Sequence, residues 1–251
     1  MKASFLTAAT LILGLALILP PVAKAAELKV LAGGSIAGPL NELKTHFEHT
    51  TGHKLTIHFD STPNLIKQVT SEAPFDLGVV PIDVFKDAAA KARFTGSTID
   101  IARVGYGVAV RAGAAKPDIS NPDALKQTLI KAQSIATLPQ SAAGTYVLSV
   151  FERLGIGEAM KAKIKPQATP AAIPQAVANG DAELGVFLTN VLIAPGVELA
   201  GSFPGDLQQE LIFTAAVALA SKEADAAKAF IAYLTTPAAI AVIKAKGMNP
   251  G

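Results

Sequence analysis

The 251-residue chain contains no cysteine and no tryptophan, and aromatic residues make up only 6% of it. Without cysteine the protein can form no disulfide, no thiolate metal site and no cysteine nucleophile. Charged residues are also sparse, at 17%, and they form no basic run or stripe. This composition argues against a nucleic-acid partner. After the first 25 residues, no stretch is apolar for the ~20 residues that a membrane-spanning helix needs.

Residues 1–25 have the pattern of a secretory signal peptide. A basic second residue precedes an apolar core at 11–19 (LILGLALIL), a double proline ends the core, and AKA at 23–25 is a small-x-small cleavage site. The core is short for a spanning helix, so an uncleaved anchor is the weaker alternative. No cysteine follows the core, which excludes a lipoprotein. We therefore expect a periplasmic protein whose mature chain begins near Ala26 and carries 20 basic and 20 acidic residues.

Half of the chain is hydrophobic, which is ample for a buried core in one large domain or two small ones. Apolar or β-branched runs predict strands at 28–32, 54–59, 76–80, 102–111, 134–138, 183–188, 197–201 and 211–220. Helical spacing and capping residues predict helices at 39–51, 65–71, 83–91, 121–132, 145–154, 174–179, 223–234 and 237–246. This alternation indicates an α/β fold with mainly parallel, buried sheets flanked by helices.

Two long strands, at 102–111 and 211–220, bracket a middle segment with its own alternation of strands and helices. The simplest interpretation is a two-lobed clamshell whose lobes are joined by a two-strand hinge. Residues 26–106 and 214–251 would form the first, discontinuous lobe, and residues 107–213 would form the second. A ligand would then lie between the lobes, at the carboxyl ends of the strands.

Three predicted junctions between a strand and a helix are rich in small and hydroxyl residues: Gly33-Gly34-Ser35, FDSTPN at 59–64, and QSAAGTY at 140–146. Glycines let the backbone approach a ligand closely, and a helix start carries partial positive charge, so such junctions suit an anion without any cationic side chain. Serine and threonine are also ordinary N-caps, and a capping role remains open at each junction. If the three junctions face one crevice, they form a single anion site.

The chain resembles the periplasmic molybdate-binding protein group of solute-binding proteins, which feed ABC importers. The resemblance runs from Leu28 to Lys246, in the segments LKVLAGGSIAGPLNEL, FDSTPNLIKQV, APFDLGVV, YGVAVRAG, SAAGTYVLSVFERLGI, ANGDAELGVFLTN and AKAFIAYLTTPAAIAVIKAKG. It implies the type II periplasmic-binding-protein clamshell. It also implies that Ser35 and Ser61 hold the ligand from the first lobe and that the backbone around Ala142–Gly144 holds it from the second. The predicted ligand-binding residues are Gly34, Ser35, Ser61, Thr62, Ala142, Ala143, Gly144, Ala171 and Leu188.

The chain departs from that group at three places. The first loop has Gly-Gly-Ser where the group usually has Ala-Ala-Ser. Leu188 stands where molybdate binders typically carry a tyrosine that donates to the oxyanion. A further backbone donor would fall near Thr169–Ala171, but Pro170 has no N–H. Each lost donor costs roughly 1–3 kcal/mol. We therefore expect a different oxyanion, or a small organic acid with an apolar part facing Leu188, at least as much as molybdate or tungstate.

All four histidines (His46, His49, His53 and His58) fall in one short segment, but their predicted placement on a helix, a loop and a strand does not make them converge. A metal site needs three or four convergent ligands, so surface and loop positions are favoured and no metal is expected.

Single charged residues allow less specific predictions of their roles. Asp76 could point into the cleft or cap a neighbouring turn, and the cap is the favoured prediction. Asp60 would oppose an anion unless it orients Ser61 or bonds an amine or hydroxyl of an organic ligand. Arg103 and Arg111 are expected to lie at solvent-facing ends of the hinge strand, and either could reach a carboxylate.

No sequence motif predicts an enzyme. The chain has no Gly-x-Ser-x-Gly elbow, no Walker loop and no Gly-x-Gly-x-x-Gly after a strand. We expect a monomeric binding protein without a cofactor, whose partners are a small anionic ligand and an ABC permease in the inner membrane. Two alternatives stay open: an exported sensor or partner-binding protein that reuses the clamshell, and a hydrolase with a histidine near Ser35 or Ser61.

Overall fold

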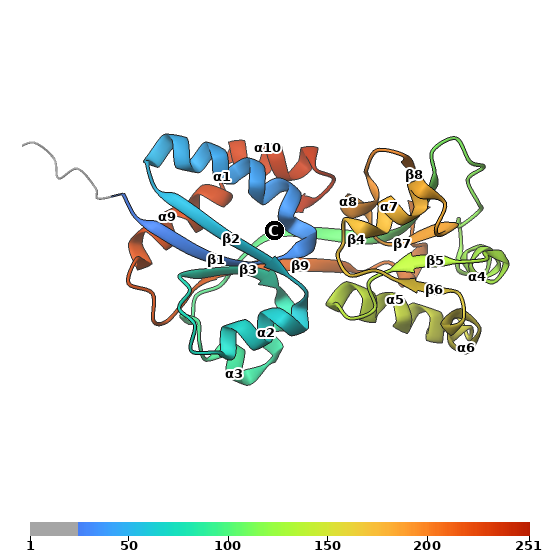
Figure 1. Ribbon diagram of the computed structural model, residues 1–251, viewed down its shortest axis with the longest axis horizontal. Helices are drawn as coiled ribbons and strands as arrows, with labels where there is room; N and C mark the ends of the chain where they lie inside the picture. The colour runs from blue at the N-terminus through green and yellow to red at the C-terminus, as the bar shows by residue number, and fades with distance from the viewer. Residues whose placement is uncertain (1–24) are drawn as a thin grey trace, which may run out of the picture.

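The computed structural model describes residues 25–251, and the predicted signal peptide lies outside the described residues except for its last residue. Figure 1 shows two α/β lobes side by side, with β4 and β9 running between them. The two-lobed clamshell expected from the sequence is therefore confirmed.

The strands of the first lobe are β1 (Glu27–Gly33), β2 (Lys54–Asp60), β3 (Leu77–Pro81), β9 (Glu210–Val217) and the short β10 (Asn249–Pro250). The second lobe contains β5 (Ile135–Thr137), β6 (Ile164–Pro166), β7 (Leu184–Leu188) and β8 (Val197–Ser202), and β4 (Ile99–Arg111) runs through both lobes. The strand order is β2-β1-β3-β9-β4-β7-β5-β6, and β8 and β10 also pair with β4. The pairs β1–β2, β1–β3, β5–β6 and β5–β7 are parallel, whereas β4 and β9 pair antiparallel with their neighbours.

Helices cover both faces of each sheet (Figure 1). In the first lobe α1 (Ala37–Thr51), α9 (Ala224–Leu234) and α10 (Pro237–Ala245) lie on one face, and α2 (Thr62–Thr70) and α3 (Ala88–Lys91) lie on the other. In the second lobe α7 (Ala172–Asn179) and α8 (Thr189–Leu192) lie opposite α5 (Ala142–Arg153) and α6 (Gly157–Lys161), and α4 (Pro122–Lys131) lies at the far end. Short 3-10 turns occur at η1 (Gly34–Ile36), η2 (Ile82–Lys86) and η3 (Gly205–Leu207).

The change from one lobe to the other occurs in the middle of β4. Gly105 still pairs with Glu210 of β9, whereas Tyr106 pairs with Leu188 of β7. At this point the side-chain amide of Gln208 clamps Tyr106: Tyr106 N donates to Oε1 at 2.8 Å, and Nε2 donates to the Tyr106 carbonyl at 2.9 Å. The hinge is thus tied together by hydrogen bonds. The division of the lobes at residues 106 and 213 stays a prediction, although Phe213 pairs with the first-lobe half of β4.

The structure differs from the sequence prediction mainly in short elements. The helix expected at 83–91 is divided into η2 and α3 because Asp87 is extended (φ −77°, ψ 119°) and its side chain accepts a hydrogen bond from Ala90 N at 2.8 Å. The short elements α6, β6 and α8 are absent from the prediction, since three to five residues carry too little periodicity to identify an element.

Within the described part of the chain, no single helix combines the length and the apolar composition needed to cross a membrane. The helices α9 and α10 have that length and composition only when they are taken as a pair, and the pair is bent by 62°. Their apolar faces are buried, including Phe230, Leu234 and Ile243.

Candidate functional site

A cavity of about 320 Å³ lies between the lobes, where strands of both lobes end and helices begin. Gly34, Ser61 and Ala143, one from each of the three junctions singled out in the sequence, all line it. The full lining is Gly33, Gly34, Ser35, Ala37, Phe59, Asp60, Ser61, Thr62, Pro81, Leu138, Ser141, Ala142, Ala143, Ala168, Thr169, Pro170, Ala171, Leu211 and Phe213. The junctions therefore share one hollow.

Four helix starts meet at this cavity. The segments before α1, α2, α5 and α7 all contribute lining residues. The first backbone N–H groups of a helix have no partner within the helix, and the aligned peptide dipoles place partial positive charge there. None of the described residues that line the cavity is lysine, arginine or histidine. Attraction of an anion to this hollow thus depends on backbone dipoles and neutral donors.

Two first-lobe hydroxyls are available to a ligand. Ser35 follows the end of β1, and Ser61 is the N-cap of α2, yet the Ser61 side chain makes no capping bond with any described residue. Neither Oγ atom has a hydrogen-bond partner within residues 25–251: the bonds of these residues run through the Ser35 carbonyl and through the N–H and carbonyl of Ser61. Both residues line the cavity and are half-buried, so each hydroxyl can donate to a bound anion.

The hydroxyl of Ser141, at the third junction, is already engaged. Ser141 accepts a hydrogen bond from Gly144 N at 3.0 Å and donates to the Leu138 carbonyl at 2.9 Å, so it caps α5. Thr62 Oγ1, across the cavity, accepts from Ala142 N at 3.3 Å. Of the first four α5 amides, this leaves Ala143 N, from a residue that lines the cavity, without a hydrogen-bond partner among the described residues. The capping role that the sequence left open therefore holds for Ser141 and not for Ser61.

Asp60 lines the cavity, but its carboxylate is held by its own neighbours. Ser61 N and Asn64 Nδ2 donate to Oδ1 at 2.7 and 2.9 Å, and Gln68 Nε2 donates to Oδ2 at 2.9 Å. Burial raises the pKa of Asp60, but the hydrogen bonds from Asn64 and Ser61 and the nearby His58 outweigh burial and hold that pKa below its usual range. Asp60 is thus a stable carboxylate that fixes the start of α2.

Contacts across the cleft hold the lobes together. Asn190 Nδ2, in the second lobe, donates to the Ser35 carbonyl in the first at 2.8 Å. Pro170 packs against Gly34 so closely that a Cβ on Gly34 would lie 3.2 Å from Pro170 Cγ. With the Thr62–Ala142 bond, these contacts bridge the two lobes beside the cavity.

Two of the predicted site residues lie away from the cavity. Leu188 is fully buried at the end of β7, where it pairs with Tyr106, so its side chain cannot face a ligand in the cavity. Gly144 is buried because α5 packs tightly on the end of β5, and a Cβ there would lie 1.7 Å from the Leu138 carbonyl oxygen. Its N–H is used by Ser141. The structure places the other seven, Gly34, Ser35, Ser61, Thr62, Ala142, Ala143 and Ala171, on one surface.

Sequence reasoning missed an apolar part of the lining, made by Phe59, Pro81, Leu138, Leu211 and Phe213. These residues occur in or beside predicted strands, where an apolar side chain is expected to be buried in the hydrophobic core. Phe213 and Pro81 are cross-strand partners on β9 and β3, and Thr169 adds a hydroxyl from the loop before α7. No sequence signal distinguishes a strand residue that ends at a cavity from one that ends in the core.

The other singled-out side chains lie elsewhere. His53 Nδ1 accepts from Ala26 N at 3.0 Å, and among the described residues no acidic or histidine cluster could hold a metal ion. Asp76 accepts from Lys29 N of β1 and from Ser221 Oγ after β9, so it links these two segments instead of capping a turn. Arg103 faces Glu210 at 3.9 Å.

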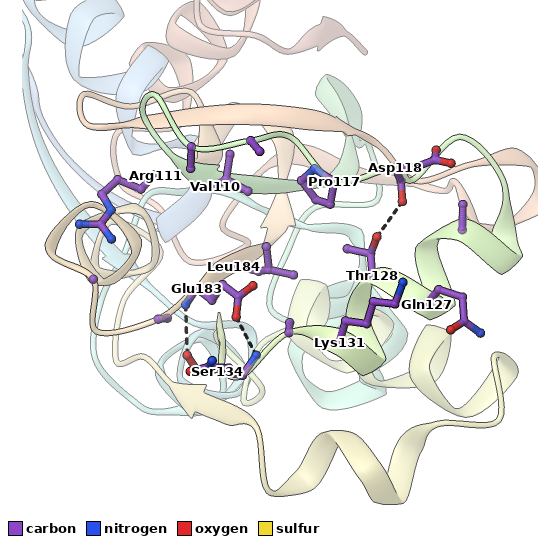
Figure 2. A pocket seen from close by; sticks show the side chains of 17 residues that line it. Val110, Arg111, Pro117, Asp118, Gln127, Thr128, Lys131, Ser134, Glu183 and Leu184 are labelled. Atoms are coloured by element: carbon purple, nitrogen blue, oxygen red, sulfur yellow. Dashed lines mark hydrogen bonds between the residues drawn. The ribbon is translucent and has the colours of Figure 1, made fainter.

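A larger hollow of about 850 Å³ lies at the far end of the second lobe, among α4, the loop after β4 and the loop before β7. Figure 2 shows Arg111, Lys131 and Glu183 on its walls. It adjoins the amino ends of β5 and β7, at Ser134 and Leu184, whereas ligands of open α/β sheets bind at the carboxyl ends. It is also lined by one lobe alone. We therefore assign the ligand site to the smaller cavity between the lobes.

Comparisons with known proteins agree with this geometry. The family model for bacterial extracellular solute-binding proteins matches residues 28–249. An aconitate isomerase from Pseudomonas sp. is 33% identical over 233 residues, covering 89% of this chain and 87% of that protein. A molybdate-binding protein ModA from Azotobacter vinelandii is 32% identical over 231 residues, covering 90% of each chain. A solved periplasmic molybdate-binding protein from Azotobacter vinelandii superposes with a TM-score of 0.74 at 23% identity, covering 89% of this chain and 99% of that one.

Proposed function

Because the chain belongs to the bacterial extracellular solute-binding proteins, we propose that it captures a small anion between its lobes and delivers it to an ABC importer. The observation that carries the proposal is the meeting of four helix starts at one cavity whose described lining contains no cation. Helix starts attract negative charge through unpaired N–H groups and aligned dipoles. Neutral donors of this kind hold an anion and still allow its release to a permease.

The proposed binding residues are the seven predicted ones that line the cavity, with Thr169 added. Ser35 and Ser61 donate their hydroxyls from the first lobe, and Ala143 N donates from the second. Closure follows from the contacts of Asn190 and Thr62 across the cleft, which form only when the lobes meet.

We place the protein in the periplasm, as a monomer exported by a signal peptide at residues 1–25 that is then removed. The family's extracellular role and the apolar core of that segment support this placement. Its protein partner is an inner-membrane permease, and the proposal includes no nucleic acid, metal or cofactor.

We further propose that the protein does not catalyse a reaction, although one relative carries the name aconitate isomerase. Moving a double bond requires a base that removes a carbon-bound proton. Among the described residues that line the cavity, Asp60 is the one carboxylate, but three hydrogen bonds and a lowered pKa make Asp60 a weak base. Serine hydroxyls without a neighbouring base are weaker still.

Incubation with cis- or trans-aconitate, followed by proton NMR, tests this absence of catalysis. We expect no interconversion above the rate in buffer. Turnover that disappears in Asp60→Asn would show instead that the carboxylate is a catalytic base.

Thermal unfolding with a panel of anions tests the binding function. A ligand at 100 times its Kd stabilises the native state by about 2.7 kcal/mol, which raises the Tm by several degrees in a chain of this size. We expect such a shift with at least one anion, and a much smaller shift in Ser35→Ala and Ser61→Ala. Ser149→Ala, on the exposed side of α5, is the matched control and should respond like the wild type. A panel without any shift would contradict the proposed function.

A further inference from the structure

One wall of the cavity is formed by side chains that have no polar atoms. Pro81 of β3 and Phe213 of β9 lie opposite each other in the sheet, and Leu211 lies two positions before Phe213 on β9. Gly33 lets this wall come close to the first junction: a Cβ there would lie 2.7 Å from Phe213 Cε1 and 3.0 Å from Pro81 Cδ. The hydrogen-bond donors therefore stand at the helix starts, and the hinge side is apolar.

A tetrahedral oxyanion is poorly matched to a cavity with two such sides. Its oxygens point in all directions, and an oxygen that faces Leu211 or Phe213 would lose its water without gaining a donor. A carboxylate differs because its charge is confined to one end of the molecule. The rest of a carboxylate ligand can be hydrocarbon, which is stabilised by burial against the apolar wall.

The size of the cavity also favours a carboxylate ligand over an inorganic oxyanion. Since a water molecule occupies roughly 30 Å³ in the liquid, a tetrahedral oxyanion with four oxygens needs roughly 120 Å³. The cavity of about 320 Å³ is therefore considerably larger than an inorganic oxyanion requires. It has room for an acid group and several carbon atoms.

The charge of the lining limits the charge of the ligand. Each helix start carries partial positive charge, which attracts a nearby anion. Asp60, whose pKa is held below its usual range, adds a negative charge to the same lining and offsets part of that attraction. The lining therefore favours a ligand of low negative charge.

From the apolar wall, the cavity volume and the charge of the lining, we infer that the ligand is a short monocarboxylate. Its acid group lies at Ser35 and Ser61, and its hydrocarbon part lies against Leu211 and Phe213. This inference rests on the proposed function and specifies its ligand.

Isothermal titration calorimetry with the exported, dialysed chain tests the inference. The ligands are the straight-chain acids from acetate to hexanoate, then succinate and aconitate, and the inorganic anions molybdate, tungstate, sulfate and phosphate. Within the straight-chain series we expect affinity to increase about fourfold with each methylene group until the cavity is full, because burying one methylene contributes about 0.8 kcal/mol.

Two leucine variants locate the hydrocarbon part. Leu211→Ala should lower the affinity for the best-binding acid about tenfold and leave acetate within about twofold, because only the longer chain reaches residue 211. Leu207→Ala is the matched control: Leu207 is equally buried, at 4% exposure against 7%, but lies outside the cavity. It should leave the dependence on chain length unchanged. Ser61→Ala should weaken every acid in the series by a similar factor.

The outcomes separate this inference from the proposed function. If molybdate, tungstate, succinate or another multiply charged anion binds more tightly than every monocarboxylate, or if affinity is independent of chain length, the inference is overturned while the anion-binding function stands. If no anion of any kind binds, the proposed function fails together with the inference.

Discussion

At the scale of single residues, Ser61 and Ser141 occupy the same position, the N-cap of a helix at the cavity, with different bonding. Ser141 accepts a hydrogen bond from Gly144 N, whereas Ser61 Oγ bonds no described residue. Ser141→Ala should therefore lower the free energy of unfolding by about 1 kcal/mol, and Ser61→Ala should change it by less than about 0.5 kcal/mol. Urea denaturation of the ligand-free chain measures both. Equal losses would mean that Ser61 caps α2 in solution.

The sequence could not separate these two serines, because both precede a helix and both follow a strand. What distinguishes them is Asp60, which takes the Ser61 N–H, and Leu138, whose carbonyl accepts the Ser141 hydroxyl. The prediction of Gly34, Ser35 and Ala143 as cavity residues depends only on the junctions between strands and helices, and the structure brings all three together. Leu188 is predicted to face the ligand only because it stands where related proteins carry a tyrosine. That position does not reveal whether the Leu188 side chain is buried.

At the scale of elements, α1 and α5 each contain a glycine near the start, and the two glycines have opposite surroundings. A Cβ on Gly144 would lie 1.7 Å from the Leu138 carbonyl oxygen, whereas a Cβ on Gly38 would meet nothing within 4 Å. Gly144→Ala should destabilise the chain by about 3 kcal/mol, because α5 must move away from β5. Gly38→Ala should stabilise it by about 0.5 kcal/mol, because alanine favours the helix.

Thermal unfolding of the two alanine variants, compared with the wild type, checks this prediction. A Gly144→Ala protein with an unchanged Tm would mean that α5 lies farther from the end of β5 than the structure places it.

The long elements were predictable from periodicity, as for the strand expected at 28–32, which the structure extends to β1 (Glu27–Gly33). The expected strand at 211–220 is observed as β9, which ends at Val217. The division of 83–91 could not be predicted, because it depends on a local bond between Asp87 and Ala90 that competes with the helix.

At the scale of the whole molecule, closure depends on a bond between residues that are 155 positions apart: Asn190 Nδ2 donates to the Ser35 carbonyl at 2.8 Å. Asn190→Asp keeps the shape but replaces the donor with an acceptor, which repels the carbonyl in the closed form. The affinity for the ligand should fall about tenfold, because a buried acceptor without a partner costs about 1–3 kcal/mol. The ligand-free chain should keep its Tm, since each lobe folds without this bond.

Calorimetry measures the affinity of this variant, and small-angle X-ray scattering measures the compaction that accompanies binding. Asn41→Asp adds the same charge on the exposed side of α1 and is the matched control. If both variants bind like the wild type, the Asn190 contact does not contribute to closure. The two lobes and their hinge could be predicted from two long strands, but pairs such as Asn190 and Ser35 have no local signature in the sequence.

The position of β9 also has a consequence for how a new chain reaches its native state. β3 pairs with β1 on one side and with β9 on the other, and β9 is made only after the second lobe. Until then, the backbone groups along one side of β3 have no neighbouring strand, and an open edge of this kind invites association with other chains. The amino-terminal third of the exported chain should therefore need protection from association until β9 has also emerged and paired with β3.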